Sequence, residues 1–127
     1  MSFLVDTHVF LWFESESPRL SGRARALIRR TDEGVYVSAA SFWEIAIKRR
    51  GGKLAYEGSP RAAARDAGFV VLAIDALDAE TAGGLDWDHR DPFDRMLVAH
   101  CLNRSLTLVT ADPALRVRRD IPVLWAG

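Results

Sequence analysis

Short, continuous apolar runs recur along the chain and alternate with longer stretches in which apolar and polar residues follow a helical spacing. Continuous apolar runs of this length are typical of strands that are buried on both faces of a sheet. We expect such strands at residues 3–5, 35–39, 69–74, 106–110 and 122–125. The segments between these runs are therefore the candidates for helices.

The intervening segments carry the start and stop signals of helices. Ser21 and Ser59 stand as N-caps before helical patterns, and Pro60 occupies the first position of its helix. The basic turn and the glycines at 48–52 form a C-terminal signature. We expect helices at residues 7–16, 21–34, 41–52, 59–68, 78–85 and 93–104, with a short one opened by Asp112 and Pro113.

Strands that alternate with helices indicate a mainly parallel sheet with helices on both faces. The chain has 127 residues, of which 49% are hydrophobic and 27% charged, and this suits one compact domain. We therefore predict a single three-layer α/β domain over residues 1–127. Seventeen basic residues balance seventeen acidic ones, so the net charge does not indicate a membrane-surface protein or a tight, non-specific nucleic-acid binder.

Cysteine use and the N-terminal residues predict the compartment. Cys101 has no partner within the chain, which is typical of a reducing environment. The opening residues, MSFLVDTH, lack the basic region and long apolar region of a signal peptide. The apolar stretches are also shorter than a membrane-spanning helix. We expect a cytoplasmic protein with no membrane association.

Four carboxylates fall at corresponding ends of the predicted elements. Asp6 ends the first strand, and Asp112 follows the fourth strand after one residue. Asp94 stands in the first turn of its helix, and Glu44 lies in the first turns of the helix after the second strand. Ligands of parallel α/β folds gather at the carboxyl ends of the strands. We therefore expect these four side chains to converge on one site.

Carboxylates that crowd together repel one another unless a cation neutralises them. A cluster of carboxylate oxygens suits Mg²⁺ or Mn²⁺, whereas a zinc site is disfavoured because the chain has one cysteine and three histidines without ligand spacing. Such ions activate a water molecule and stabilise charge on a phosphate oxygen. Hydrolysis of a phosphodiester is the chemistry that this set of residues predicts.

Each acid also has a structural interpretation. Asp112 before Pro113 suits an N-cap, and Glu44 could lie on the solvent face of an amphipathic helix. Asp91 suits the N-cap of the helix that carries Asp94, and it is also spaced for an ion pair with Arg95.

Two hydroxyl side chains and two basic residues are supporting candidates. Thr110 could orient Asp112 or a water molecule, and Ser38 could act similarly near Glu44 or cap the following helix. Lys48 and Arg49 could hold the phosphate backbone of a nucleic acid, although both also complement a helix C-terminus.

Three other phosphate-handling classes lack their signals. A phosphoacceptor receiver domain needs an acidic pair after the first strand and a lysine after the last, which VDTH and VLWAG do not supply. A haloacid-dehalogenase-like phosphatase needs a second aspartate where His8 stands. A dinucleotide-binding module needs a glycine-rich first turn, which DTHVFL lacks.

The chain resembles PIN-domain ribonucleases over essentially its full length, and within that family it is similar to the VapC-type toxins of toxin–antitoxin pairs. The motifs that carry the resemblance are FLVDTHVFLW, SAASFWEIAIKRRGGKL, HRDPFDRMLVAHC, LTLVTAD and the closing VLW. The resemblance implies a PIN fold, Mg²⁺- or Mn²⁺-dependent RNA cleavage, homodimers and inhibition by a cognate antitoxin. It also implies an acidic metal site at Asp6, Glu44, Asp94 and Asp112.

We therefore predict a metal-dependent endoribonuclease that acts as a toxin, with in-line attack of water leaving a 5′-phosphate and a 3′-hydroxyl. The alternative is a PIN-like module that binds RNA or protein without catalytic activity.

Overall fold

A five-stranded sheet forms the centre of the computed structural model, which describes residues 2–30 and 34–127. The strands are β1 (Phe3–Val5), β2 (Val35–Ser38), β3 (Val70–Leu72), β4 (Thr107–Thr110) and β5 (Val123–Trp125). Their order is β3-β2-β1-β4-β5, and every neighbouring pair is parallel. The carboxyl ends of all five strands therefore lie at the same edge of the sheet.

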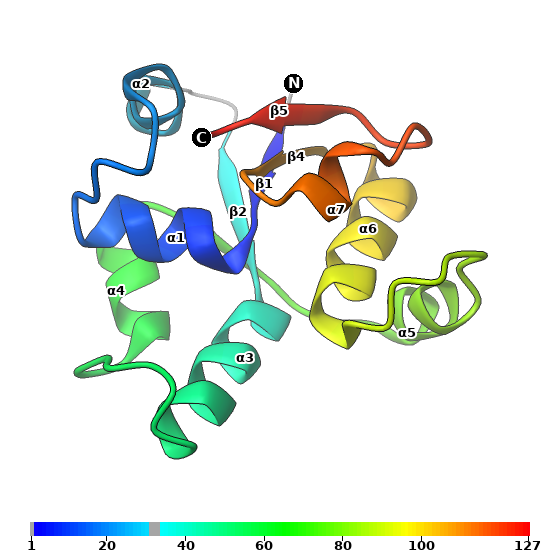
Figure 1. The fold of residues 1–127 in the computed structure, drawn as a ribbon, viewed down its shortest axis with the longest axis horizontal. Helices are drawn as coiled ribbons and strands as arrows, with labels where there is room; N and C mark the ends of the chain where they lie inside the picture. The colour runs from blue at the N-terminus through cyan, green and yellow to red at the C-terminus, as the bar shows by residue number, and fades with distance from the viewer. Residues whose placement is uncertain (1, 31–33) are drawn as a thin grey trace.

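Helices cover both faces of this sheet, as Figure 1 shows. The elements α1, α2 and α4 lie on one side, and α5, α6 and α7 lie on the other. Their bounds are α1 (Thr7–Glu14), α2 (Gly22–Arg30), α3 (Ala39–Arg50), α4 (Pro60–Asp66), α5 (Ala76–Gly83), α6 (Pro92–Arg104) and α7 (Pro113–Arg116). Helix α3 begins directly after β2 and contacts both α1 and α6.

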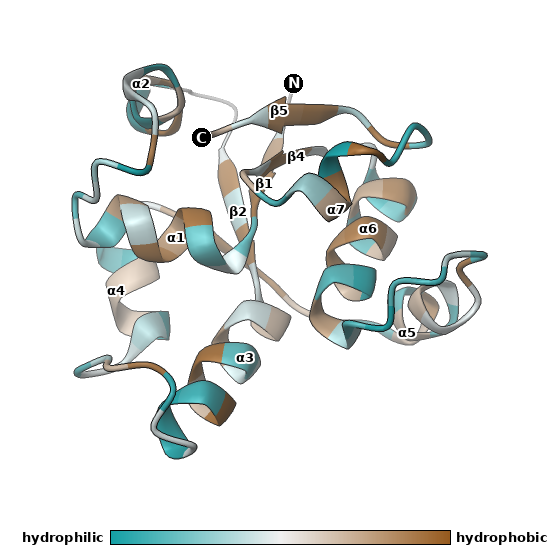
Figure 2. Cartoon of the chain, viewed as in Figure 1, coloured by the Kyte–Doolittle hydropathy of each residue, from teal (hydrophilic) through white to brown (hydrophobic). Residues whose placement is uncertain are grey.

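The central strands β1 and β4 contribute to two cores because successive side chains point to opposite faces of a sheet. In β1, Phe3 and Val5 pack with the helices of one side, whereas Leu4 packs with α6 and α7 on the other. In β4, Val109 and Leu108 divide in the same way. These strands are buried on both faces, which explains why they read as continuous apolar runs. Figure 2 shows the contrast with the hydrophilic loop that precedes α6.

The structure confirms the predicted three-layer α/β class and shifts several boundaries. The helix predicted at 78–85 spans Ala76–Gly83, because Asp75 and Asp78 form a reciprocal capping box that starts it earlier. The strand predicted at 69–74 is shortened to Val70–Leu72 at the sheet edge. The helix predicted at 21–34 ends at Arg30, and residues 31–33 lie outside the described part of the chain.

Membrane insertion finds no support in the helices. Within residues 2–30 and 34–127, none of them combines the length and the apolar character that crossing a bilayer requires.

Candidate metal centre

Asp6 lies at the junction of β1 and α1, where its backbone pairs with β4 and its side chain caps α1. Its N–H donates to the carbonyl of Val109 at 3.0 Å and so continues the β1–β4 pairing. Its side chain caps α1 by accepting a hydrogen bond from the N–H of Val9 at 2.8 Å. The residue is only 4% exposed, and this burial raises the pKa of its carboxyl group.

Thr110, the last residue of β4, joins two of the four predicted acids. Its hydroxyl donates a hydrogen bond to Oδ2 of Asp6 and accepts the N–H of Asp112 at 3.0 Å. Asp112 in turn caps α7 by accepting the N–H of Ala114 at 2.9 Å, so the predicted capping role is confirmed. The bond to Asp6 was not anticipated, because the sequence alone does not show that β1 and β4 are neighbours.

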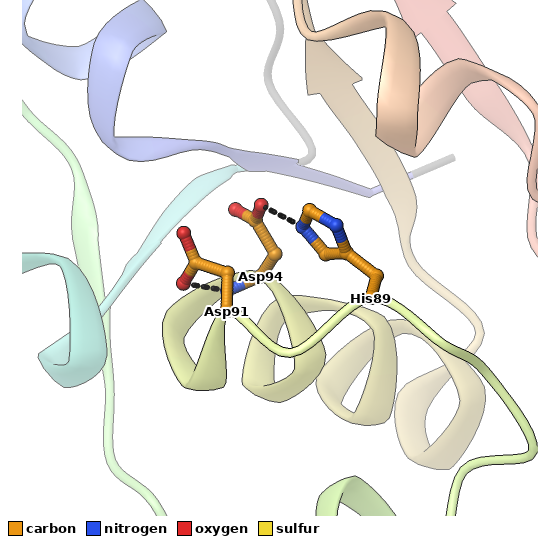
Figure 3. A group of neighbouring side chains, drawn as sticks. All are labelled: His89, Asp91 and Asp94. Atoms are coloured by element: carbon orange, nitrogen blue, oxygen red, sulfur yellow. Dashed lines mark hydrogen bonds and ion pairs between the residues drawn. The ribbon is translucent and has the colours of Figure 1, made fainter.

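The start of α6 carries a second acidic group, drawn in Figure 3. Asp91 is the N-cap, as predicted, and its Oδ1 accepts the N–H groups of Phe93 and Asp94 at 2.9 and 3.2 Å. Oδ2 of Asp94 lies 2.7 Å from Nε2 of His89. Burial raises the pKa of Asp94 to about 6, against the lowering effect of the His89 contact. The repulsion of Asp91 and Asp112 adds to the rise.

Glu44 is buried in the structure, at 6% exposure, so it does not lie on a solvent face of α3. Its Oε2 contacts Nζ of Lys48 at 2.6 Å, one helical turn later. Ser38 caps the same helix by accepting the N–H of Ala40 at 3.0 Å, which confirms the predicted capping role. Thr7 and Ser41 share a buried hydrogen bond of 2.9 Å that ties α1 to α3.

All four predicted acids line one cavity of about 60 Å³ at the carboxyl edge of the sheet. The complete lining is Asp6, Thr7, His8, Glu44, Lys48, Asp91, Asp94 and Asp112. Five acidic side chains thus face a single basic one, Lys48, together with one histidine, His8. Such an excess of negative charge is unfavourable without a cation. Burial is the main cause of the raised pKa values of Asp6 and Asp94, and repulsion from neighbouring carboxylates adds to it.

Oxygen donors dominate this cavity, and they suit Mg²⁺ or Mn²⁺. The tightest group of donors in the described residues is His89, Asp91 and Asp94, with one ligand atom of each within 4.8 Å of the others. The sequence alone did not indicate His89 as a metal ligand, because the three histidines of the chain lack the ligand spacing of a zinc site. The spacing His-x-Asp-x-x-Asp immediately before a helix is the signal that could have placed it at the site.

Arg95 fixes the loop that brings His89 to Asp94. Its guanidinium donates to five backbone carbonyls, those of Ala82, Gly83, Leu85, Trp87 and His89, at 2.8–3.4 Å. The ion pair predicted between Asp91 and Arg95 is therefore wrong. Arg95 binds the main chain that leads into α6 and not the carboxylate of Asp91.

The two basic residues predicted to bind RNA have different surroundings. Lys48 lines the acidic cavity through its contact with Glu44. Arg49 donates to the carbonyls of Tyr56 and Gly58 at 3.3 and 2.9 Å, so its guanidinium is bonded to the loop that follows α3.

A larger cavity of about 270 Å³ adjoins the acidic one and shares Asp6, His8 and Asp112 with it. Trp12 and Arg19 complete its polar and aromatic lining. Sequence reasoning did not single out Arg19, because the turn that carries it follows no periodic pattern.

Comparison with known proteins places this architecture. The family model described as the PIN domain matches residues 3–120. No curated protein matches the chain. Among solved structures, VapBC2 from Rickettsia felis, bound to a DNA fragment from its promoter, has a TM-score of 0.71 and 12% identity, with 100% of both chains covered. FitAcB from Neisseria gonorrhoeae has a TM-score of 0.64 and 22% identity, with 96% of both chains covered.

A third structure is VapC20 from Mycobacterium tuberculosis, described as a sarcin-ricin loop cleaving toxin. Its TM-score is 0.60 at 19% identity, with 90% of this chain and 92% of that chain covered. The TM-scores show a shared fold at these low identities, and the family model extends over nearly the whole sequence. The chain therefore belongs to the PIN domain family.

Proposed function

We propose that the protein is a Mg²⁺- or Mn²⁺-dependent endoribonuclease and the toxin of a toxin–antitoxin pair. The observation that carries the proposal is the single cavity lined by Asp6, Glu44, Asp94 and Asp112 at the carboxyl edge of a parallel sheet. Structural neighbours that include VapBC2 and VapC20, the latter described as a sarcin-ricin loop cleaving toxin, support the same activity.

The donors of the cavity fit a hard divalent cation. Asp6, Asp94 and Asp112 would hold the ion through carboxylate oxygens, and Glu44 would either bind it or orient the attacking water. When bound, such an ion supplies an activated water and stabilises the charge that develops on a phosphate oxygen.

The protein residues around the ion have separable tasks. Thr110 and the N–H of Val9 fix both oxygens of Asp6, so this carboxylate is held in one orientation before any ligand arrives. Asp91 keeps the first turn of α6 in place beneath Asp94. Lys48 contacts Glu44 and is 39% exposed at its side chain, so it is available to an RNA phosphate.

The neighbouring cavity offers a path for the rest of the RNA. Arg19 supplies a positive charge for a phosphate, and Trp12 supplies an aromatic surface for a base. In-line attack of water on phosphorus would leave a 5′-phosphate and a 3′-hydroxyl.

The partners belong to the same proposal. Structural neighbours include a toxin–antitoxin complex from Klebsiella pneumoniae, which supports a cognate antitoxin for this chain. Trp43 and Ile47 leave α3 with an apolar exposed face, which supports a homodimer. We place the protein in the cytoplasm, where its RNA substrate would be.

The test is cleavage of total cellular RNA by purified protein with Mg²⁺ or Mn²⁺, with EDTA as the metal-free condition. Asp94→Asn removes one proposed ligand, and Asp66→Asn makes the same change at the exposed end of α4, outside the cavity lining. We expect discrete fragments with 5′-phosphates from the wild type and from Asp66→Asn, and none from Asp94→Asn or with EDTA. RNA binding without cleavage under either metal would instead favour the non-catalytic binding module.

A further inference from the structure

A chain of buried polar side chains links α3, α6 and α5. Oγ of Ser38, at the start of α3, lies 2.8 Å from Nε2 of His100 in α6. Nδ1 of His100 lies 3.3 Å from Oδ2 of Asp78 in α5. All three residues are fully buried. We call Ser38, His100 and Asp78 the buried relay.

Asp78 is stabilised at its end of the buried relay. Arg104 donates to both of its oxygens at 2.6 and 2.9 Å, and Asn103 donates at 3.0 Å. Burial alone would raise the pKa of Asp78, but these hydrogen bonds and the N–H of Asp75 outweigh burial and lower it. In the described residues no buried side-chain donor or acceptor lacks a partner. The polar atoms of the buried relay therefore all have partners, and Asp78 at its end is held by the charged guanidinium of Arg104.

The contact between Ser38 and His100 does not depend on the tautomer. Burial lowers the pKa of His100, so the imidazole is neutral near pH 7. A neutral imidazole has one donor and one acceptor nitrogen, and a serine hydroxyl can serve as either partner. Ser38 also accepts the N–H of Ala40, so one oxygen joins the helix cap of α3 to the middle of α6.

The arrangement has the order of a Ser-His-Asp triad, but its burial excludes nucleophilic chemistry. Ser38 has no exposed surface, and none of the three residues lines the acidic cavity or the cavity beside it. A substrate carbonyl or phosphate cannot approach Oγ of Ser38. The role of the buried relay is therefore to be found in the elements that it connects.

We infer that the buried relay is a positioning device that fixes α3 relative to α6, and so holds Glu44 and Asp94 at a set separation across the cavity. Glu44 lies on α3 and Asp94 on α6, and the two helices contact each other directly. Apolar contact is non-directional and tolerates sliding, whereas a buried hydrogen bond requires one register. The inference rests on the proposed metal site for its consequence in ion binding.

Substitutions at His100 can remove its contact with Ser38 and its contact with Asp78 separately. Gln places its amide near the position of Nε2 and can keep the bond to Ser38, whereas Asn places its amide near Nδ1 and loses that bond. Ser38→Ala is less informative because it also removes the cap of α3. Ile28→Ala, in α2 on the opposite face of the sheet, is the control for a general loss of core stability.

The first measurement is Mn²⁺ affinity by titration calorimetry, with thermal unfolding measured beside it. We expect His100→Asn to weaken Mn²⁺ binding by about tenfold, the lower end of the effect of outer residues that orient metal ligands. His100→Gln should stay close to the wild type, and Ile28→Ala should lower the Tm without changing the Mn²⁺ affinity. Equal weakening by Ile28→Ala would overturn the inference, because lost stability would then explain the effect.

The second measurement does not require a metal. Arg50 on α3 and Leu102 on α6 are exposed, so cysteines introduced there can carry spin labels. Pulsed electron paramagnetic resonance between labels at Arg50→Cys and Leu102→Cys reports the distance between the two helices. Cys101 is buried, and burial raises the pKa of its thiol to about 12, so it should remain unlabelled. We expect a broadened distance distribution in His100→Asn and the wild-type distribution in His100→Gln.

These measurements distinguish failure of the inference from failure of the proposed function. An unchanged distance distribution in His100→Asn would refute the positioning role whatever the metal data show. A wild-type chain that does not bind Mn²⁺, together with a broadened distribution in His100→Asn, would refute the metal site and leave the positioning of the helices standing.

Discussion

Two acidic centres lie near opposite ends of α6, and their surroundings shift the pKa of the carboxyl group in opposite directions. At the start of the helix, burial raises the pKa of Asp94 to about 6, with His89 as its hydrogen-bond partner. Near the end of the helix, Asp78 is more deeply buried, yet its pKa is lowered by Arg104 and Asn103. Asp78 is thus paired with a cationic side chain, whereas Asp94 lies among other carboxylates.

The contrast separates a structural carboxylate from a candidate ligand. Asp78 has hydrogen-bond donors for both oxygens and a permanent cation within 3 Å, so it needs nothing from outside the chain. Asp94 faces Asp6, Asp91 and Asp112 across a cavity in which Lys48 is the basic residue. Negative charge without sufficient protein compensation is what a cation site requires before it binds its ion.

The largest expected effect comes from removing the charge of Asp78, the carboxylate that Arg104 and Asn103 stabilise. Asp78→Asn leaves the partly buried Arg104 with its more exposed ion pair to Asp75, and breaking the pair with the buried carboxylate costs up to about 3 kcal/mol. We expect a corresponding fall in the free energy of unfolding, measured by urea denaturation. Asp86→Asn, on the exposed loop before α6, should change it very little. Equal stability of both variants would show that the contrast is wrong.

Binding of Mn²⁺ at the acidic cavity that contains Asp94 should stabilise the folded protein. Mn²⁺ at one hundred times its Kd would stabilise the folded state by about 2.7 kcal/mol if it binds only that state. We expect thermal unfolding of the wild type to shift upward with Mn²⁺ and to return with EDTA. A shift of the same size in Asp94→Asn would place the ion elsewhere.

Neutralising the uncompensated acid should have the opposite sign from Asp78→Asn. Asp94→Asn removes a charge that burial, and then repulsion from Asp91 and Asp112, make unfavourable, and a pKa raised from 3.8 to about 6 corresponds to a gain of at most about 3 kcal/mol at pH 7. The measurement is urea denaturation of the metal-free protein. A loss of stability would mean that the His89 contact outweighs the repulsion at this site.

The smallest effect is the pH dependence of that gain. The raised pKa means that folded Asp94 keeps its proton where the unfolded chain has lost it, so its stabilising contribution is full below about pH 4 and is lost as the pH rises through about 6. The difference between Asp94→Asn and the wild type should therefore be near zero at pH 4 and grow up to pH 7. Thermal unfolding of both proteins across this range measures it, and a difference independent of pH would exclude Asp94 as its source.

The sequence supported the fold well because its signals are local. Continuous apolar runs marked the strands, and Ser59, Asp91 and Asp112 were identified as caps from their neighbours alone. The helix beginning at Ala76 was misplaced because its capping box uses two aspartates, Asp75 and Asp78, rather than the usual serine or threonine.

The site was predictable only in part. The rule that ligands gather at the carboxyl edge brought Asp6, Glu44, Asp94 and Asp112 together, and these side chains line one cavity. The partners of the acids were not predictable, because they depend on strand order and helix packing. Thr110 reaches Asp6 only since β4 lies beside β1, and His100 meets Ser38 only since α6 crosses the start of α3.

Arg95 has a consequence for how this protein could diverge. Its guanidinium holds the segment from Ala82 to His89 entirely through main-chain carbonyls, which every amino acid possesses. The exposed side chains of Asp86, Asp88 and Arg90 carry none of that support. The loop can therefore exchange its surface chemistry without losing its shape, and it is the place beside the acidic cavity where target preference could be rewritten by mutation.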